Sequence, residues 1–86
     1  MEYAMWLESE RQAGRIKWWR RQIPVKLEVN GIKVATMNID FKCEYPDGHQ
    51  EYHEVKSAAT SKDMYYRLKF RLFKALFPDV IYQIIN

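Results

Sequence analysis

Ile39-Asp40-Phe41 and His53-Glu54-Val55-Lys56 are the two segments that decide how this 86-residue chain is interpreted. Pro46-Asp47-Gly48 lies between them and predicts a turn, so the segments are expected to be partner strands of a hairpin. Side chains alternate between the two faces of a strand. The glutamate and the lysine therefore point the same way, and the aspartate, which stands between two apolar residues, joins them in one possible register.

Two carboxylates and a lysine at one sheet edge suit a divalent metal. Mg²⁺ usually takes one or two carboxylates, with waters and phosphate oxygens in the remaining positions. Such an ion lowers the pKa of a bound water and neutralises charge on a phosphoryl group, and Lys56 can orient that water. The same spacing also occurs by chance on solvated hairpins, so a hairpin without a metal is the alternative interpretation.

Length and composition predict one small domain that spans residues 1–86. Charged residues make up 29% and aromatic residues 15% of the chain, which excludes disorder and low complexity. The net charge of +3 fits a nucleic-acid partner but is also ordinary for a soluble protein. No apolar run reaches the length of a membrane span, so we expect a cytoplasmic protein with no membrane partner.

Turn and capping signals place the other elements. Asn30-Gly31 is a strong hairpin signal, Gly14 is a natural helix stop, and Thr60 with Asp63 forms a capping box. We expect the order helix, three antiparallel strands, helix, strand, with the last strand buried and parallel to a neighbour because it follows a crossover helix. We expect a helix at 2–13, an extended segment at 15–21 and strands at 25–29 and 32–45. A third strand follows the second turn and ends at 56, and it is followed by a helix at 62–77 and a strand at 80–85. An irregularity at 35–38 within the second strand would re-aim Asp40.

Cations and aromatic residues alternate in the segment after the first helix. Alternation separates Ile16 and Trp18 on one face from Lys17, Trp19 and Arg21 on the other. Such a segment can stack on bases and contact phosphates. The alternative is that one tryptophan belongs to the core and the other covers a sheet edge.

Lys69 interrupts the apolar side of the second helix. It lies four residues after Tyr65, so we expect it to point toward the sheet. It is either a lysine whose stem packs while its amine reaches solvent, or a cation aimed at the metal site. The predicted apolar arc comprises Tyr65, Leu68, Leu72, Phe73, Leu76 and Phe77, and the cations on the opposite side are Arg67, Arg71 and Lys74.

The cysteine and the two histidines are expected to be structural or exposed. Cys43 is the single cysteine, which excludes an internal disulfide, and it alternates with Phe41 and Ile39 as a core thiol would. His49 and His53 could in principle transfer protons or bind a metal. Alternation sends His53 away from the neighbouring glutamate, however, and His49 lies at a turn.

Several separate motifs resemble the PD-(D/E)xK, or restriction-endonuclease-like, nucleases, and the likeness covers nearly the whole chain. Ile39-Asp40-Phe41 is similar to the family's Pro-Asp-Phe, and His53-Glu54-Val55-Lys56 to its Glu-Val-Lys. Residues 14–18, 66–73 and 77–79 are similar to its first strand, its basic helix and the Tyr-Pro-Asp that follows. The resemblance is greatest to small phage-borne members, including the junction-resolving endonucleases.

The resemblance implies an α+β fold, similar to an α/β sandwich, with the order αβββαβ and helices packed on a mixed sheet. It further implies a metal-dependent endodeoxyribonuclease, in which Asp40 and Glu54 hold Mg²⁺, or Mn²⁺ in its place. The Val55 carbonyl and Glu2 would be further ligands. A homodimer in the host cytoplasm would cut branched or structured phage DNA, and nicking of ordinary duplex DNA is the alternative.

The resemblance also assigns roles to the basic residues. Lys56 would position the attacking water, and Lys69 would support the scissile phosphate. The expected DNA contacts are Lys17, Trp19, Arg20, Arg21, Arg67, Arg71 and Lys74.

Two other interpretations of the chain are open. It could be a catalytically silent DNA-binding module with the nuclease fold, for example a subunit of a phage complex. It could also be a small α+β adaptor in which the motif is a coincidence, and Asp40 and Glu54 would then lie far apart.

Overall fold

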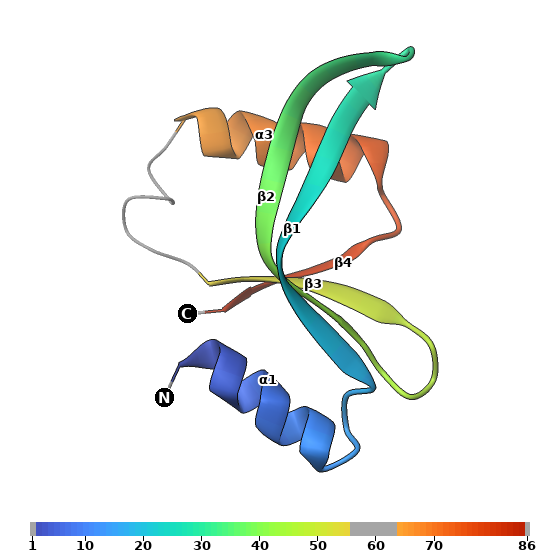
Figure 1. The fold of residues 1–86 in the computed structure, drawn as a ribbon. Coiled ribbons are helices and arrows are strands. Elements are labelled where there is room, and N and C mark those ends of the chain that lie inside the picture. Colours follow the sequence, from blue (N-terminus) through green and yellow to red (C-terminus); the bar gives the residue numbers. More distant parts are fainter. Residues whose placement is uncertain (1, 56–63, 86) are drawn as a thin grey trace.

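The computed structural model describes residues 2–55 and 64–85. Four strands form one mixed sheet, and a helix lies on each side of it (Figure 1). The α+β class is confirmed, and the described elements follow one another in the expected succession. They are α1 (Tyr3–Gln12), β1 (Trp18–Val29), β2 (Ile32–Glu44), β3 (Gln50–Val55), α3 (Met64–Leu76) and β4 (Ile81–Ile85). Neither of the helices within residues 2–55 and 64–85 has the length and apolar composition needed to cross a membrane.

Two tight turns build the antiparallel part of the sheet. The strand order is β1-β2-β3-β4, and the first three strands pair antiparallel in sequence. Asn30 and Gly31 have φ angles of 53° and 79°, and positive values at both positions characterise a two-residue hairpin turn. In the second turn, Gly48 has a φ of 91° and its N–H donates to the Tyr45 carbonyl. Both predicted hairpins are confirmed.

β4 lies beside β3 and runs parallel to it, as expected for a strand that follows a crossover helix. The expectation that this strand is buried is wrong, because Ile81 and Ile84 are 41% and 47% exposed. The physical reason is that, in the described part of the chain, β4 lies at the edge of the sheet with β3 as its one neighbouring strand.

Each helix covers its own apolar cluster on its own side of the sheet. Tyr52 and His53 show this division, because Tyr52 packs with α3 while its neighbour His53 contacts Tyr3 of α1. Cys43 is fully buried beneath α1, which confirms it as a core thiol. The α1 cluster comprises Ala4, Leu7, Ile16, Phe41 and Cys43, and the α3 cluster comprises Leu27, Met37, Ile39 and Phe73.

The long β1–β2 hairpin contributes to both clusters, because it twists as it passes from α1 toward α3 (Figure 1). Phe41 belongs to the α1 cluster, whereas Ile39, two residues earlier, belongs to the α3 cluster. Asp40 lies between them, where the strand changes from one cluster to the other. The residue across from it, Gln22, has a φ of 55°, and the ladder of paired Cα atoms omits this pair.

The structure corrects the predicted position of the irregularity in this hairpin. Residues 35–38 pair regularly with β1. The register shifts just outside that range, between Leu27 and Glu28, so that Val34 is the extra residue of a bulge. A distortion does lie beside Asp40, but it is the positive φ of Gln22 in the neighbouring strand.

β1 is one continuous strand, although the sequence predicted two segments. It passes through Pro24, which an edge strand tolerates because its outward side forms no ladder hydrogen bonds. Ile16 precedes this strand and packs in the same cluster as Trp19. The expected placement of these two residues on opposite faces is wrong, because strand alternation begins only at Trp18.

α3 packs partly through the predicted apolar arc, because Leu72, Phe73 and Leu76 belong to the α3 cluster, but its N-terminal half packs through an adjacent stripe. Tyr65 and Leu68 are 76% and 54% exposed, and Tyr66 and Phe70 pack against the sheet in their place. Phe73 is the buried centre of the contact, as the arc predicted. Because so many residues of this helix are apolar or aromatic, the 100° periodicity does not choose between adjacent stripes.

The helix bounds agree closely with the predicted ones where the structure describes them. α1 lies within the predicted 2–13, and Gly14, with a φ of 81°, follows its end. α3 ends at Leu76, one residue before the predicted end. The predicted start of this second helix and the capping box of Thr60 and Asp63 lie outside the described residues.

Candidate active site

The two carboxylates predicted at the sheet edge meet on neighbouring strands. In the β2–β3 ladder Phe41 faces His53, so the next step along both strands brings Asp40 opposite Glu54. The Val55 N–H donates a hydrogen bond of 2.9 Å to Asp40 Oδ2. The pairing of β2 with β3 therefore positions both acidic residues in one site.

Glu54 is buried, with 6% of its surface exposed, whereas Asp40 is partly exposed. Burial disfavours the ionised carboxylate and, together with the hydrogen bond and negative charge of Asp40, raises the pKa of Glu54 to about 7. Glu54 therefore keeps its proton below about pH 7. A cation that replaces this proton would relieve the repulsion between the two carboxylates.

Two tyrosines that the sequence analysis did not single out complete the surroundings of Glu54. The Tyr82 hydroxyl of β4 donates a 3.1 Å hydrogen bond to Glu54 Oε2. The Tyr66 hydroxyl of α3 lies 2.8 Å from the Tyr82 hydroxyl. Burial raises the pKa of both phenols, so both remain protonated donors at neutral pH.

Glu2 does not join Asp40 and Glu54. Its side chain is more than half exposed and forms an ion pair of 2.9 Å with Arg21. Across residues 2–55 and 64–85, no group of three or more His, Cys, Asp and Glu side chains is arranged to hold a metal ion. The carboxylate ligands that the described site offers are therefore Asp40 and Glu54, to which the predicted Val55 carbonyl would add an uncharged oxygen.

Of the two lysines predicted to act in catalysis, the structure describes one, Lys69. Lys69 is half-buried and lies three residues after Tyr66 and four before Phe73, on the stripe of α3 that packs against the sheet. Lys56 lies outside the described residues.

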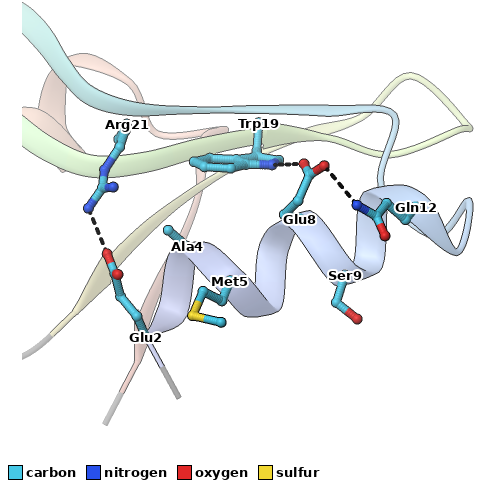
Figure 2. A pocket seen from close by; sticks show the side chains of 8 residues that line it. All are labelled: Glu2, Ala4, Met5, Glu8, Ser9, Gln12, Trp19 and Arg21. Atoms are coloured by element: carbon cyan, nitrogen blue, oxygen red, sulfur yellow. Dashed lines mark hydrogen bonds and ion pairs between the residues drawn. The ribbon is translucent and has the colours of Figure 1, made fainter.

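A shallow groove between α1 and β1 contains two of the predicted DNA contacts (Figure 2). The Trp19 indole N–H donates a 3.0 Å hydrogen bond to Glu8 Oε1, and Arg21 pairs with Glu2. Hydrogen bonds from Arg11 and Trp19 lower the pKa of Glu8 to about 2. This groove lies on the α1 side of the sheet, whereas Tyr82, which contacts Glu54, belongs to the α3 cluster.

The remaining predicted DNA contacts come from two separate elements. Near the start of β1, Lys17 forms an ion pair of 3.3 Å with Glu44, and the Arg20 guanidinium lies 5.2 Å from the centre of the Trp18 ring. On α3, Arg67 and Arg71 are exposed and Lys74 is half-buried.

A second polar network lies on the α1 side of β3. His53 is buried, and its ring nitrogens contact the Tyr3 hydroxyl at 2.6 Å and Glu51 Oε1 at 2.9 Å. The other oxygen of Glu51 lies 2.9 Å from His49 Nε2, and His49 Nδ1 contacts Asp47. His53 therefore faces away from Glu54, as alternation predicted, and has a structural environment.

No protein-family model matches the chain, and no curated protein matches it. The interpretation of the site therefore depends on the residues and their geometry.

Proposed function

We propose that this protein is a divalent-metal-dependent endodeoxyribonuclease whose metal ligands are Asp40 and Glu54. The observation that supports the proposal is the meeting of these two carboxylates, one of them buried, on paired strands. The interpretation as an adaptor expected the two carboxylates to lie far apart, and their proximity disfavours it. Their chemistry suits Mg²⁺ or Mn²⁺, which accept one or two carboxylates together with waters and phosphate oxygens.

The chain's own residues would position the reactants. Asp40 and Glu54 would replace their shared proton with the cation, and the Val55 carbonyl would be a further ligand. When bound, the divalent cation supplies Lewis-acid chemistry that activates water and neutralises charge on the phosphate. Lys56 would orient the attacking water, and Lys69, on the stripe of α3 that faces the sheet, would support the scissile phosphate.

DNA is the proposed substrate, and a structured or branched DNA is the proposed form. Arg67 and Arg71 are exposed on the side of α3 opposite Lys69, so they would contact DNA phosphates away from the scissile one. Lys17, Trp19, Arg20, Arg21 and Lys74 are the other proposed contacts.

A second copy of this chain is the proposed partner. β4 is an edge strand in the described sheet, with the sequence Ile81-Tyr82-Gln83-Ile84-Ile85, and it carries no charge and no proline. β1, at the other edge, contains Pro24 and several charged residues, which discourage strand addition. The contrast favours a homodimer that pairs through β4.

Cleavage assays test the proposed activity. Plasmid, linear duplex and four-way junction DNA would be incubated with the protein in Mg²⁺, in Mn²⁺ or in EDTA. We expect cutting that requires the metal and falls at least a hundredfold in Asp40→Asn and Glu54→Gln, while Glu28→Gln, which neutralises an exposed carboxylate of β1, keeps full activity. A folded protein that binds DNA but cuts none of these substrates would contradict the proposal and favour a binding module.

A further inference from the structure

The hydrogen bonds around Glu54 run in one direction, from α3 through β4 to β3. A phenol hydroxyl has a single hydrogen, and Tyr82 donates its hydrogen to Glu54 Oε2 over 3.1 Å. The 2.8 Å bond between the two tyrosines is therefore donated by Tyr66 to the Tyr82 oxygen. Glu54 is thus held by a donor that is itself held by a second donor.

The two phenol rings are fixed by packing in the α3 cluster. The Tyr82 ring lies 4.9 Å from the Phe70 ring in an edge arrangement and 5.7 Å from the Phe73 ring. The Tyr66 ring stacks on the Phe70 ring of the same helix, with the ring centroids 6.4 Å apart. Because these rings are embedded among aromatic neighbours, their hydroxyls hold a fixed position from which to orient Glu54.

Each of the two carboxylates of the site accepts a hydrogen bond at one of its oxygens. One oxygen of Glu54 accepts the Tyr82 hydroxyl, and one oxygen of Asp40 accepts the Val55 N–H. The two carboxylates also hydrogen-bond to each other, and a shared ligand would replace that contact. Donors behind a metal-binding carboxylate commonly set its orientation in this way, and their loss weakens metal binding by about 10- to 100-fold.

We propose that Tyr82 is a positioning residue, supported by Tyr66, which holds the Glu54 carboxylate in the orientation that binds the divalent cation. This inference rests on the proposed function, because it assigns the metal site of that function two further residues. It links the site to α3 and β4, two elements that the motif on β2 and β3 does not include.

Three matched substitutions test the inference, since phenylalanine keeps each ring and removes only the hydroxyl. Mn²⁺ affinity would be measured by calorimetry in the wild type, Tyr82→Phe, Tyr66→Phe and Tyr52→Phe. The Tyr52 ring packs edge-on against Phe73 in the same layer and provides the control. We expect about a tenfold loss of affinity in Tyr82→Phe, a smaller loss in Tyr66→Phe and no change in Tyr52→Phe.

Two further measurements separate positioning from a structural role and from a failure of the proposed function. A positioning defect would be overcome by excess Mn²⁺, so Tyr82→Phe would regain cleavage at saturating metal. In the metal-free protein, NMR side-chain couplings would show one Glu54 rotamer in the wild type and averaged rotamers in Tyr82→Phe.

The results separate a failure of the proposed metal binding from a failure of the positioning role of Tyr82. If the wild type binds no Mn²⁺ but the rotamer of Glu54 depends on Tyr82, the metal function is wrong and the positioning contact is real. If Tyr82→Phe keeps both the wild-type rotamer and the wild-type Mn²⁺ affinity, or if Tyr52→Phe weakens binding as much, the inference is overturned.

Discussion

The two sides of β3 differ in the partners of their ionisable residues. On the α1 side, His53 and His49 both contact Glu51, so each basic ring meets an acidic partner. On the α3 side, Glu54 meets another acid, Asp40, and its pKa is raised as a result of burial and that neighbour. The first arrangement pairs bases with an acid, whereas the second pairs two acids.

This difference separates structural polar residues from candidate functional ones. A network of complementary donors and acceptors stabilises the fold and needs nothing further. A buried pair of like groups lowers stability whenever both are ionised, and it persists in a folded protein because something else compensates. We expect a divalent cation to provide that compensation, and substitutions on the α1 side and the α3 side of β3 test this difference.

The largest expected effect is on the α3 side and depends on pH. The folded state raises the pKa of Glu54 from 4.5 to about 7, so between these values the folded protein binds more protons than the unfolded chain. Wild-type stability should therefore fall as the pH rises through this window, relative to Glu54→Gln, which has no titrating group. At pH 8 and without metal, we expect the variant to be the more stable by about 3 kcal/mol.

Urea denaturation of both proteins at several pH values measures this difference. The two free energies of unfolding should converge near pH 4 and separate progressively up to about pH 7. A constant difference across the whole range would mean that Glu54 has an ordinary pKa and that the contact with Asp40 has no electrostatic consequence.

The opposite result is expected on the α1 side. Glu51→Ala removes the acceptor shared by His53, His49 and the Tyr45 hydroxyl, and His53 is buried. We expect a loss of about 2 kcal/mol in the free energy of unfolding at pH 7, because buried polar groups lose their partner. Glu28→Ala, at an exposed position of β1, should change stability by less than about 0.5 kcal/mol.

Assays of metal-dependent DNA cleavage compare Glu51→Ala with Glu54→Gln. Glu51→Ala should reduce stability without reducing activity at a temperature where it remains folded, whereas Glu54→Gln should do the reverse. A selective loss of metal-dependent cleavage in Glu51→Ala would place function on the α1 side and remove the distinction between the two faces.

The sequence predicted those parts of the site that depend on local signals. Asn30-Gly31 and Pro46-Asp47-Gly48 each specify a tight turn, and the second turn sets the register that brings Asp40 to Glu54. Strand alternation then assigned Glu54 and His53 to opposite faces. These inferences need only the backbone geometry of neighbouring strands.

The parts that could not be predicted depend on contacts between distant elements. Tyr82 reaches Glu54 only because β4 aligns with β3 in one particular parallel register, and no turn specifies that register. Tyr66 reaches Tyr82 only because α3 packs through Tyr66 and Phe70 rather than through Tyr65. In a helix with so many aromatic residues, tertiary packing makes that choice.

We propose above that Asp40 and Glu54 together bind a divalent cation in place of a proton. Isothermal titration of Mn²⁺ into the wild type and Asp40→Asn, at pH 6 and pH 8, tests it most directly. We expect the wild type to bind Mn²⁺ more strongly at pH 8 and with proton release at pH 6, and Asp40→Asn to show no measurable binding. Absence of wild-type binding at either pH, or equal binding by the variant, would contradict it.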